Sequence, residues 1–402
     1  MNASCLTHLE ALPGGETFPP DAPRNGSDGA VLFARYDLRR VRREVTREAI
    51  ERGPATLWRY APLLPVADPA HAVTLGEGYT PLLRTERLGA QVGCRDLWVK
   101  DEGRNPSGTF KDRGAAVAVS RYRELGVKTV ALNSSGNAGG SWALYCARAG
   151  IGCVDILPTD AQASSLSHCA SAGARTYFVE DWHASGRIVA DACRQYGWFN
   201  VCTLKEPYRL EGKKTMGLEI AEQLGWRLPD VVVYPMGGGL GAIAIWKAFY
   251  ELAELGWTGG KLPRLIVTQY AGCAPAVKAF DEGKLDVEPW TRLDVPPGGL
   301  KSPNPPGGRL VLEIIRRHGG AALAVTTEEA LDAVAEMARA EGVFACPESA
   351  TTLAGLRKAL ARGLVESDER VVLVSTGSGL KSIPVLPQPA VRTIGAAAEI
   401  GA

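Results

Sequence analysis

The sequence predicts an α/β protein built on parallel sheets. From Asp96 onward, short runs rich in Val, Ile and Leu alternate with segments of helical periodicity. The apolar runs are continuous, as in strands that are buried on both faces. Glycine-rich turns follow several of these runs, and parallel sheets bind ligands in the turns that lead from a strand into a helix.

The individual elements follow from these patterns in chain order. Residues 1–30 are rich in Gly, Pro, Asn and Asp without periodicity, which predicts a loop-rich arm, and a polar helix is expected near 38–52. The expected strands are 97–100, 129–133, 153–157, 176–179, 231–234, 265–269 and 371–375. The expected helices are 111–125, 137–149, 214–224, 241–255, 328–340 and 349–361. Thr326, followed by acidic residues, is typical of a helix start.

Composition excludes several classes of protein. The 402 residues include 45 Lys and Arg against 44 Asp and Glu, a balance that argues against a strongly basic nucleic-acid-binding protein. No run approaches the roughly 18 apolar residues of a membrane span, and no secretory signal is evident. The nine cysteines form no CxxC pair, which favours buried, reduced thiols in a cytoplasmic protein and gives no metal-binding pattern.

Two glycine-rich turns lie between a predicted strand and a predicted helix. One spans 133–140 and reads Asn-Ser-Ser-Gly-Asn-Ala-Gly-Gly; the other spans 235–241 and reads Pro-Met-Gly-Gly-Gly-Leu-Gly. Backbone N–H groups in such a turn, together with the dipole of the following helix, favour an anion such as a phosphate. Close packing of strand against helix is the alternative, because the spacing matches neither a GxGxxG nor a P-loop pattern.

Two further segments carry side chains that suit a ligand site. Lys111 begins the helix 111–125, where the helix dipole disfavours a cation and lowers the pKa of an amine. A lowered pKa suits a lysine that forms a Schiff base, although an ordinary solvated lysine is the simpler interpretation of this segment alone. Ser375 and Thr376 end the strand 371–375 and could bind a ligand or cap the turn.

Together these segments resemble the fold-type-II family of pyridoxal phosphate enzymes, most closely the threonine synthases. The resemblance runs from about 57 to 381 and includes further segments in the same order, at 75–82, 98–102 and 208–215. It implies two parallel-sheet domains of the tryptophan-synthase-β-like type after an N-terminal arm. The implied boundaries are 1–70 for the arm and first helix, 71–119 plus 216–402 for a larger domain, and 120–215 for a smaller one.

The family also implies a role for each matching residue. Lys111 would bind pyridoxal 5′-phosphate as a Schiff base and act as the catalytic acid and base. Phe110 would line the ring pocket, Asn137 would hydrogen-bond the ring oxygen, and Ser375 or Thr376 would meet the pyridine nitrogen. The cofactor phosphate would lie on the turn formed by Gly237, Gly238, Gly239, Leu240 and Gly241. The substrate would be received by Ser134, Ser135, Gly136 and Asn137, with Arg209 available for a phosphate or carboxylate.

Four departures from the threonine-synthase pattern bear on metal and substrate. Many relatives begin with cysteine pairs suited to a zinc knuckle, whereas this chain keeps only Cys5 there, so we expect no metal. Ala138 replaces a threonine and Leu204 replaces a serine, and both of those hydroxyls belong to the substrate-phosphate site of the family. Gly238 replaces an asparagine, which makes the turn more like that of the dehydratases of the same fold.

Two lyase activities are therefore expected as alternatives. The first, which the overall resemblance favours, converts O-phosphohomoserine to threonine and phosphate by γ-elimination and β-addition of water. The second, which the missing phosphate ligands favour, is β-elimination or β-replacement on another amino acid, as in serine/threonine or hydroxyaspartate dehydratases. A binding protein that has lost catalysis is disfavoured because Lys111 and Asn137 are both intact.

Some features stay open at this point. The family is commonly dimeric, which implies a homodimer, and neither nucleic acid nor membrane is expected as a partner. The Pro/Gly stretch at 295–309 is either a loop that gates the substrate or a simple surface connection. The tail at 384–402 could be disordered or could cross to a partner subunit.

Overall fold

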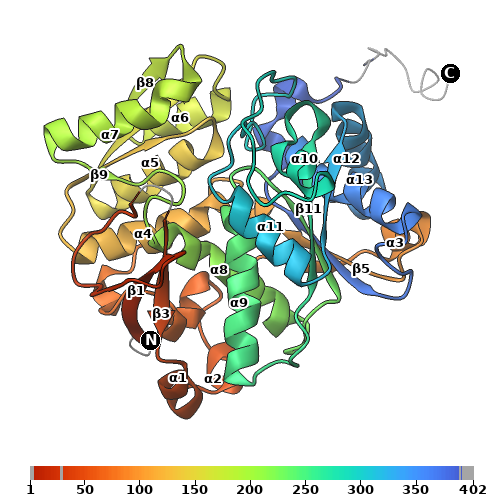
Figure 1. Cartoon of the computed structure of the whole chain (residues 1–402), viewed down its shortest axis with the longest axis horizontal. Coiled ribbons are helices and arrows are strands. Elements are labelled where there is room, and N and C mark those ends of the chain that lie inside the picture. Colours follow the sequence, from red (N-terminus) through yellow and green to blue (C-terminus); the bar gives the residue numbers. More distant parts are fainter. Residues whose placement is uncertain (1–3, 28–29, 389–390, 392–402) are drawn as a thin grey trace, which may run out of the picture.

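The structure, a computed structural model, describes residues 4–27, 30–388 and 391. Two α/β lobes meet around the long helices α8 and α9, and a small N-terminal sheet lies beside them (Figure 1).

The strands are β1 (Leu6–Leu12), β2 (Thr17–Phe18), β3 (Val31–Tyr36), β4 (Leu82–Arg84), β5 (Asp96–Asp101), β6 (Thr129–Asn133), β7 (Gly152–Pro158), β8 (Arg175–Val179), β9 (Phe199–Asn200), β10 (Val231–Pro235), β11 (Arg264–Tyr270), β12 (Ala321–Val325) and β13 (Arg370–Ser375). The α-helices are α1 (Leu38–Glu44), α2 (Arg47–Glu51), α3 (Glu86–Val92), α4 (Lys111–Glu124), α5 (Asn137–Ala149), α6 (Ala163–Ser171), α7 (Ser185–Tyr196), α8 (Tyr208–Gln223), α9 (Leu240–Leu255), α10 (Pro275–Asp281), α11 (Gly308–Arg317), α12 (Thr327–Glu341) and α13 (Pro347–Ala361).

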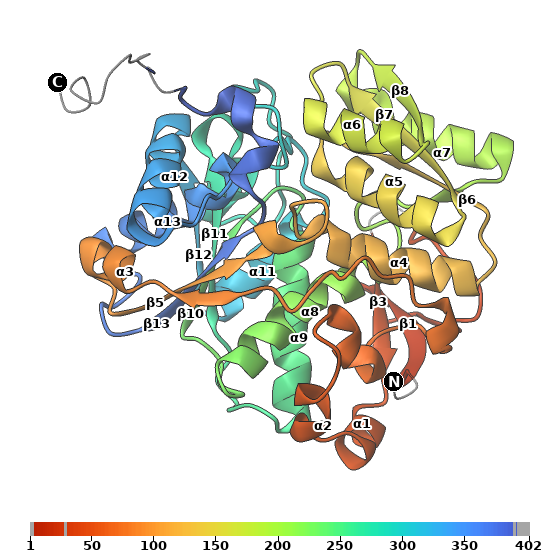
Figure 2. The ribbon, with the colours of Figure 1, turned by 180° about the vertical axis from the view of Figure 1, so that it is seen from behind.

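The larger sheet has six strands in the order β12-β11-β10-β13-β5-β4, and all its pairs are parallel except β4 with β5. Its strands are buried on both faces. Val231 and Val233 of β10 belong to the core under α12 and α13, whereas Val232 and Tyr234 belong to the core under α9 and α11. Figure 2 shows α12 and α13 on the outer side of this sheet. Burial on both faces explains why these strands read as unbroken apolar runs.

The smaller sheet has four parallel strands in the order β8-β7-β6-β9. Helix α4 contacts both α5 of this lobe and α8 of the other, so it bridges the two lobes. The seven predicted strands are confirmed to within one residue at each end. The predicted parallel α/β class is therefore confirmed. The prediction missed β12, whose sequence is mostly alanine and contains Val325 as its one β-branched residue, so it carries a weak strand signal.

Most predicted helices are confirmed, with two informative differences. The capping box at Thr326 is present, and its side chain accepts a hydrogen bond from the backbone of Glu329. The single helix expected at 38–52 is instead α1 and α2, because Thr46 interrupts it and caps the second helix. Helix α8 begins at Tyr208, six residues before the expected start at 214.

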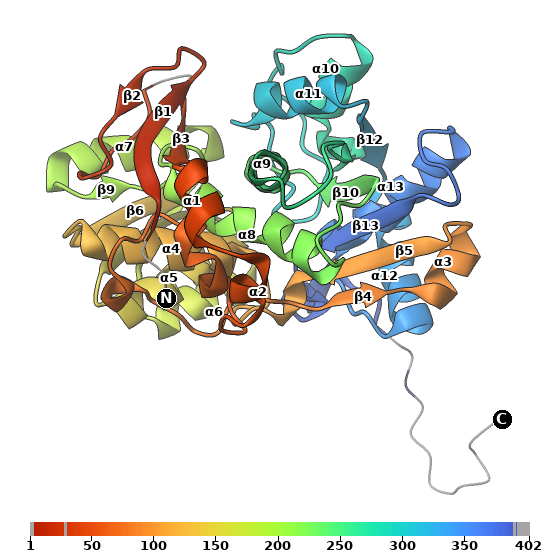
Figure 3. The same cartoon turned by 90° about the horizontal axis from the view of Figure 1, so that it is seen from below.

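The loop-rich arm expected at 1–30 is wrong at Leu6–Leu12 and Thr17–Phe18, which form strands. β1 and β2 form an antiparallel sheet with β3, in the order β2-β1-β3. Leu9 and Ala11 of β1 are buried in the same core as Val117 and Val119 of α4. Figure 3 shows this sheet beside α4. The alternation within β1 is too short to stand out among the surrounding glycines and prolines.

Other chain-wide expectations can be placed on this fold. The nine cysteines are unpaired, and all but Cys193 are buried. Within the described ranges, no helix is long and apolar enough to cross a membrane. Of the tail at 384–402, residues 389–390 and 392–402 lie outside the described residues.

Candidate active site

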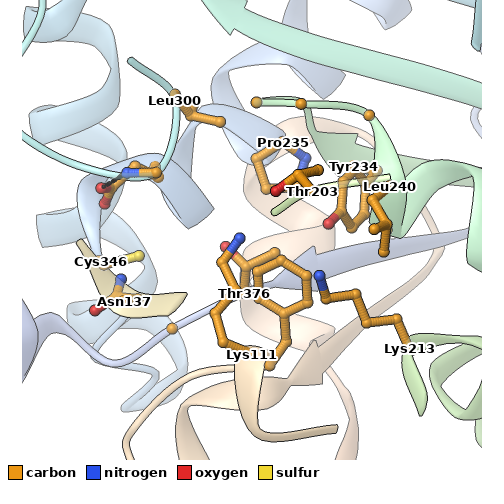
Figure 4. Close-up of a pocket in the computed structure, with 18 residues that line it drawn as sticks. Lys111, Asn137, Thr203, Lys213, Tyr234, Pro235, Leu240, Leu300, Cys346 and Thr376 are labelled. Carbon is orange, nitrogen blue, oxygen red and sulfur yellow. Dashed lines mark hydrogen bonds between the residues drawn. The ribbon is translucent and has the colours of Figure 1, made fainter. Parts of the chain in front are cut away.

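The predicted site residues meet where parallel strands end and helices begin. Lys111 begins α4 after β5, Asn137 begins α5 after β6, the turn 235–241 joins β10 to α9, and Thr376 follows β13. They line one cavity between the two lobes (Figure 4). The cavity is lined by Phe110, Lys111, Asn137, Thr203, Lys213, Tyr234, Pro235, Gly237, Gly238, Gly239, Leu240, Gly241, Gly299, Leu300, Cys346, Glu348, Thr376 and Gly377.

Lys111 lies in this cavity rather than in bulk solvent, so the solvated interpretation is wrong. Its Nζ is 4.5 Å from the centroid of the Phe110 ring. The preceding turn is tied to the turn after β13, because the N–H of Phe110 donates to the carbonyl of Thr376 at 3.0 Å. Burial and, next, the charge of Arg209 lower the pKa of Lys111 to about 8, against a smaller opposing effect of Glu348. A substantial fraction of this amine is therefore uncharged near neutral pH.

A fully buried ionic network fixes the helix that carries Lys111. Arg113 donates to Glu102 at 2.5 and 2.8 Å and to Glu219 at 2.6 and 2.7 Å. Glu219 also accepts from Lys100 at 2.7 Å. Burial alone would raise the pKa of Glu219, but Arg113 and Lys100 together lower it to about 2. The network joins α4, α8 and β5, so it holds the Lys111 backbone in place.

The glycine-rich turn 235–241 has the shape of an anion cradle. Gly239 precedes α9 with a φ of +86°, a left-handed conformation that glycine adopts without strain. A Cβ at position 241 would lie 1.9 Å from the Oη of Tyr234, so only glycine fits there. Gly238 is different, since a Cβ there would meet Thr203 and Pro306 no closer than 3.3 Å.

Asn137, Ser375 and Thr376 are expected around the cofactor ring, but not all of them face the cavity. The Oδ1 of Asn137 is buried and has no hydrogen-bond partner among the described residues. Thr376 lines the cavity, and its hydroxyl lies 3.2 Å from that of Ser349. Ser375 does not line the cavity; its Oγ is buried behind it, also without a partner in the described part of the chain. Of the two hydroxyls, Thr376 is therefore the one that faces a ligand.

A second, open cavity adjoins the first and contains the predicted substrate residues. Lys111, Asn137, Thr203, Gly238 and Gly299 line both cavities. The second is also lined by Asn133, Ser134, Ser135, Gly136, Ala138, Trp182, His183, Ser185, Gly186, Cys202, Lys205, Arg209, Lys301, Ser302, Pro303, Asn304 and Pro306. Arg209 is buried and donates to the carbonyl of Val201, and its guanidinium carbon is 5.7 Å from the centroid of the Trp142 ring.

Thr203 supplies a hydroxyl-bearing side chain that the sequence comparison missed. Leu204, which replaces the expected serine, has a φ of +60°, an uncommon conformation for a residue other than glycine. Its side chain is buried in the core with Leu210 and Met216. Thr203, one residue earlier, lines both cavities.

The Pro/Gly stretch 295–309 is not a simple surface connection. Gly299 lines both cavities, and residues 301–304 line the second. The stretch also contacts the smaller lobe. Ser135 donates to the carbonyl of Gly298 at 3.3 Å, Gln162 donates to the carbonyl of Pro297 at 3.2 Å, and Lys301 pairs with Asp160 at 2.5 Å. These contacts join the stretch to the smaller lobe beside the second cavity.

Several cavity residues carried no sequence prediction. Tyr234 reads only as part of an apolar strand, and Cys346 and Glu348 lie at the start of α13, where acids are common for capping reasons. Lys213 lies within the matching segment 208–215, but the expected helix start at 214 placed it in a loop. A correct start for α8 would have marked it as one helical turn from Arg209.

Comparison with known proteins identifies the family. The family model described as "Pyridoxal-phosphate dependent enzyme" matches residues 73–377. The chain belongs to this family. Among curated proteins, it is 37% identical to a threonine synthase of Methanocaldococcus jannaschii over 90% of this chain and 89% of the relative. It is also 37% identical to a threonine synthase of Methanosarcina acetivorans over 96% of each chain. It is therefore a threonine synthase-like, pyridoxal-phosphate-dependent enzyme, a carbon–oxygen lyase.

Solved structures show the same fold at lower identity. Diaminopropionate ammonia lyase from Escherichia coli matches with a TM-score of 0.65 and 19% identity, covering 77% of this chain and 87% of that one. Maize serine racemase matches with a TM-score of 0.63 and 21% identity, covering 75% and 88%. At these identities the likeness establishes the fold-type-II architecture, which confirms the expected fold.

The cavity of this pyridoxal-phosphate-dependent enzyme fits the cofactor of its family. Lys111 offers an amine of lowered pKa, and the turn before α9 offers backbone N–H groups at a helix N-terminus. The side-chain amide of Asn137 forms no hydrogen bond with the described residues, so its Nδ2 is available to donate to a ligand oxygen. An amine, an anion cradle and an uncommitted amide are the groups that an aldehyde, a phosphate and a ring oxygen require.

Proposed function

We propose that this enzyme converts O-phosphohomoserine and water to threonine and phosphate. The observation that carries the proposal is the charge of the second cavity. Its lining includes the cationic side chains of Lys205, Arg209 and Lys301 beside the amine of Lys111, and the described lining residues include no Asp or Glu, although Lys301 also pairs with Asp160. A phosphate monoester carries a charge of about −1.5 to −2 near neutral pH, in addition to the substrate's carboxylate. A cationic pocket without carboxylates suits such a substrate.

Other residues of the second cavity can replace the phosphate-binding hydroxyls that this chain lacks relative to the family pattern. Ala138 and Leu204 remove two hydroxyls, but Thr203 faces the cavity in place of Leu204. Lys301 reaches the same cavity from the Pro/Gly stretch. We assign the substrate phosphate to Arg209, Thr203 and Lys301, and the substrate carboxylate to the turn of Ser134, Ser135 and Gly136 at the start of α5.

For the cofactor, we assign the phosphate to the turn from Gly237 to Gly241, Leu240 included, and the ring oxygen to Asn137. Phe110 borders the ring pocket, and Thr376 is assigned to the ring nitrogen in preference to Ser375. When bound, pyridoxal phosphate supplies an electron sink that stabilises negative charge on the substrate carbons.

Lys111 carries the proton transfers in this proposal. As a free amine, its Nζ accepts the proton from the substrate Cα and then serves at Cβ, while the phosphate departs from Cγ to the cationic groups. Water adds at Cβ, and the proton held by Lys111 returns to the substrate. The Pro/Gly stretch keeps bulk water from the reacting carbons, because it covers the cavity between Ser135 and Asp160.

A second candidate is β-elimination on a dicarboxylic hydroxy amino acid such as 3-hydroxyaspartate. The absence of the family's asparagine at Gly238 favours it, as does the ability of Arg209 to pair with a carboxylate. It requires only removal of the Cα proton and loss of the β-hydroxyl, both within reach of Lys111.

Two incubations of the holoenzyme separate these activities. With O-phosphohomoserine we expect phosphate and threonine in equal amounts, and with homoserine, which lacks the phosphate, we expect neither. With serine, threonine and 3-hydroxyaspartate, ammonia and a 2-oxo acid are measured. Phosphate without threonine, or turnover of 3-hydroxyaspartate alone, would overturn the first activity.

The homodimer and the cytoplasmic location expected from the sequence stay predictions. The first rests on the family resemblance and is tested by light scattering of the purified enzyme. The second rests on nine unpaired thiols, which suit a reducing compartment.

A further inference from the structure

Lys213 is a second lysine of the cofactor cavity, and the proposed reaction does not use it. It lies on α8 one helical turn after Arg209, and only 2% of its surface is exposed. Figure 4 shows its side chain extending toward Lys111, and the Nζ is 5.1 Å from the centroid of the Phe110 ring. A buried ammonium is costly unless an anion compensates it, so the surroundings of this group are informative.

No described protein group compensates Lys213. Neither a hydrogen bond nor an ion pair to its Nζ is formed by the described residues. Burial, then the charges of Lys111 and Arg209, lower the pKa of Lys213 well below its ordinary value, and Glu206 opposes this only weakly. Glu206 is engaged elsewhere, since it accepts from the hydroxyl of Tyr122 at 2.6 Å and from the N–H of Tyr208 at 2.7 Å.

The position of Lys213 points to the cofactor rather than to the amino-acid substrate. It lines the first cavity but not the second, whereas Arg209 lines the second but not the first. Figure 4 shows Asn137 on one side of Lys111 and Lys213 on the other. In pyridoxal phosphate, the ring oxygen and the phosphate-bearing arm flank the aldehyde carbon on opposite sides. If Asn137 meets the ring oxygen, Lys213 faces the arm that carries the phosphate.

We propose that Lys213 pairs with the phosphate of pyridoxal phosphate and supplies the one side-chain cation of the cofactor-phosphate site. The glycine turn contributes N–H groups and a helix dipole equivalent to about half a charge, which leaves most of a phosphate dianion unbalanced. Lys111 cannot supply the remainder, because it is committed to the aldehyde. The proposal rests on the family's cofactor and not on the substrate proposed above, so failure of the threonine assay leaves it standing.

The test compares two ligands on the apoenzyme, pyridoxal phosphate and pyridoxal, which differ only in the phosphate. In Lys213→Met, which keeps the aliphatic stem, we expect the affinity for pyridoxal phosphate to fall by about tenfold to a hundredfold, the range of a charge-assisted hydrogen bond. The affinity for pyridoxal should stay the same. Lys213→Arg should keep the preference for the phosphorylated ligand. Lys278→Met, which removes an exposed lysine of α10, is the control for net charge.

Two outcomes would overturn the proposal. Equal losses for both ligands would mean that Lys213 acts on Lys111 or on the pocket shape, and no loss for either would mean that it has no role in cofactor binding. Thermal unfolding of the apoenzyme gives a second readout that does not depend on activity. Because Lys213→Met removes an uncompensated buried amine, the apoenzyme should be at least as stable as the wild type, while the stabilisation gained from pyridoxal phosphate should shrink. If Lys213→Met does not fold, Lys213→Gln takes its place in both measurements.

Discussion

The ionisation of Lys111 can be tested directly by varying the pH. Burial and Arg209 lower its pKa from 10.5 to about 8. At pH 7.5, about 24% of an amine with a pKa of 8 is uncharged, against about 0.1% for an ordinary lysine. The site therefore offers roughly 240 times more reactive amine than a solvated lysine would.

The assay follows the combination of the apoenzyme with pyridoxal in the visible spectrum. Pyridoxal is preferred to the phosphorylated cofactor here, because its lack of a phosphate removes a second titrating group. Since the uncharged amine is the reactive form, the rate should rise with pH and reach half its maximum near pH 8. Lys111→Ala should not react, which shows that no other lysine produces the absorbance.

A second variant tests the cause of the shift. After burial, the charge of Arg209 is the next largest cause of the lowered pKa of Lys111. Replacing Arg209 with Met should therefore raise this pKa, and the pH at which the reaction rate is half its maximum should increase. Lys278→Met, on the exposed surface, should leave the midpoint unchanged. A wild-type midpoint near 10.5 would refute the reasoning, because it would mean that the Lys111 amine is fully hydrated.

Two further substitutions test the scaffold of the site. Arg113→Met leaves Glu102 without a paired cation and Glu219 with only one. We therefore expect the free energy of unfolding, measured by urea denaturation, to fall by about 3–5 kcal/mol. A loss below about 1 kcal/mol would contradict a buried network. Gly241→Ala places a Cβ 1.9 Å from the Oη of Tyr234, so it should cost about 1–3 kcal/mol of stability and weaken cofactor binding, whereas Gly259→Ala, where a Cβ meets nothing within 4 Å, should do neither.

Much of the cofactor site could be predicted from the sequence because its parts are local. Each glycine turn lies directly after a strand that is apolar on both faces, and the carboxyl ends of parallel strands converge on one region whatever the rest of the chain does. The turn at 237–241 was therefore predicted from a local pattern, the resemblance to the family added Lys111 and Asn137, and the structure brings all of them to one cavity. The errors fell where the local signal is weak, as in β1, which mixes apolar and polar residues among glycines and prolines, and in β12, which is mostly alanine.

The substrate side depended on tertiary structure. A sequence alignment treats position 204 as a lost hydroxyl, but the left-handed backbone of Leu204 sends that side chain into the core, and Thr203 faces the cavity instead. The Pro/Gly stretch carries no periodicity, so only the structure shows that it lines the second cavity and contacts Ser135 and Asp160 of the smaller lobe.

The α/β class follows from the burial pattern of the strands, and the cofactor follows from the resemblance of several ordered segments to the family. Which charges share a cavity depends instead on tertiary packing. Arg209 and Lys213 are four residues apart on α8, which packs against both α4 and α9, yet they line different cavities. That difference arises from the packing of three helices distant in sequence, which no local pattern records.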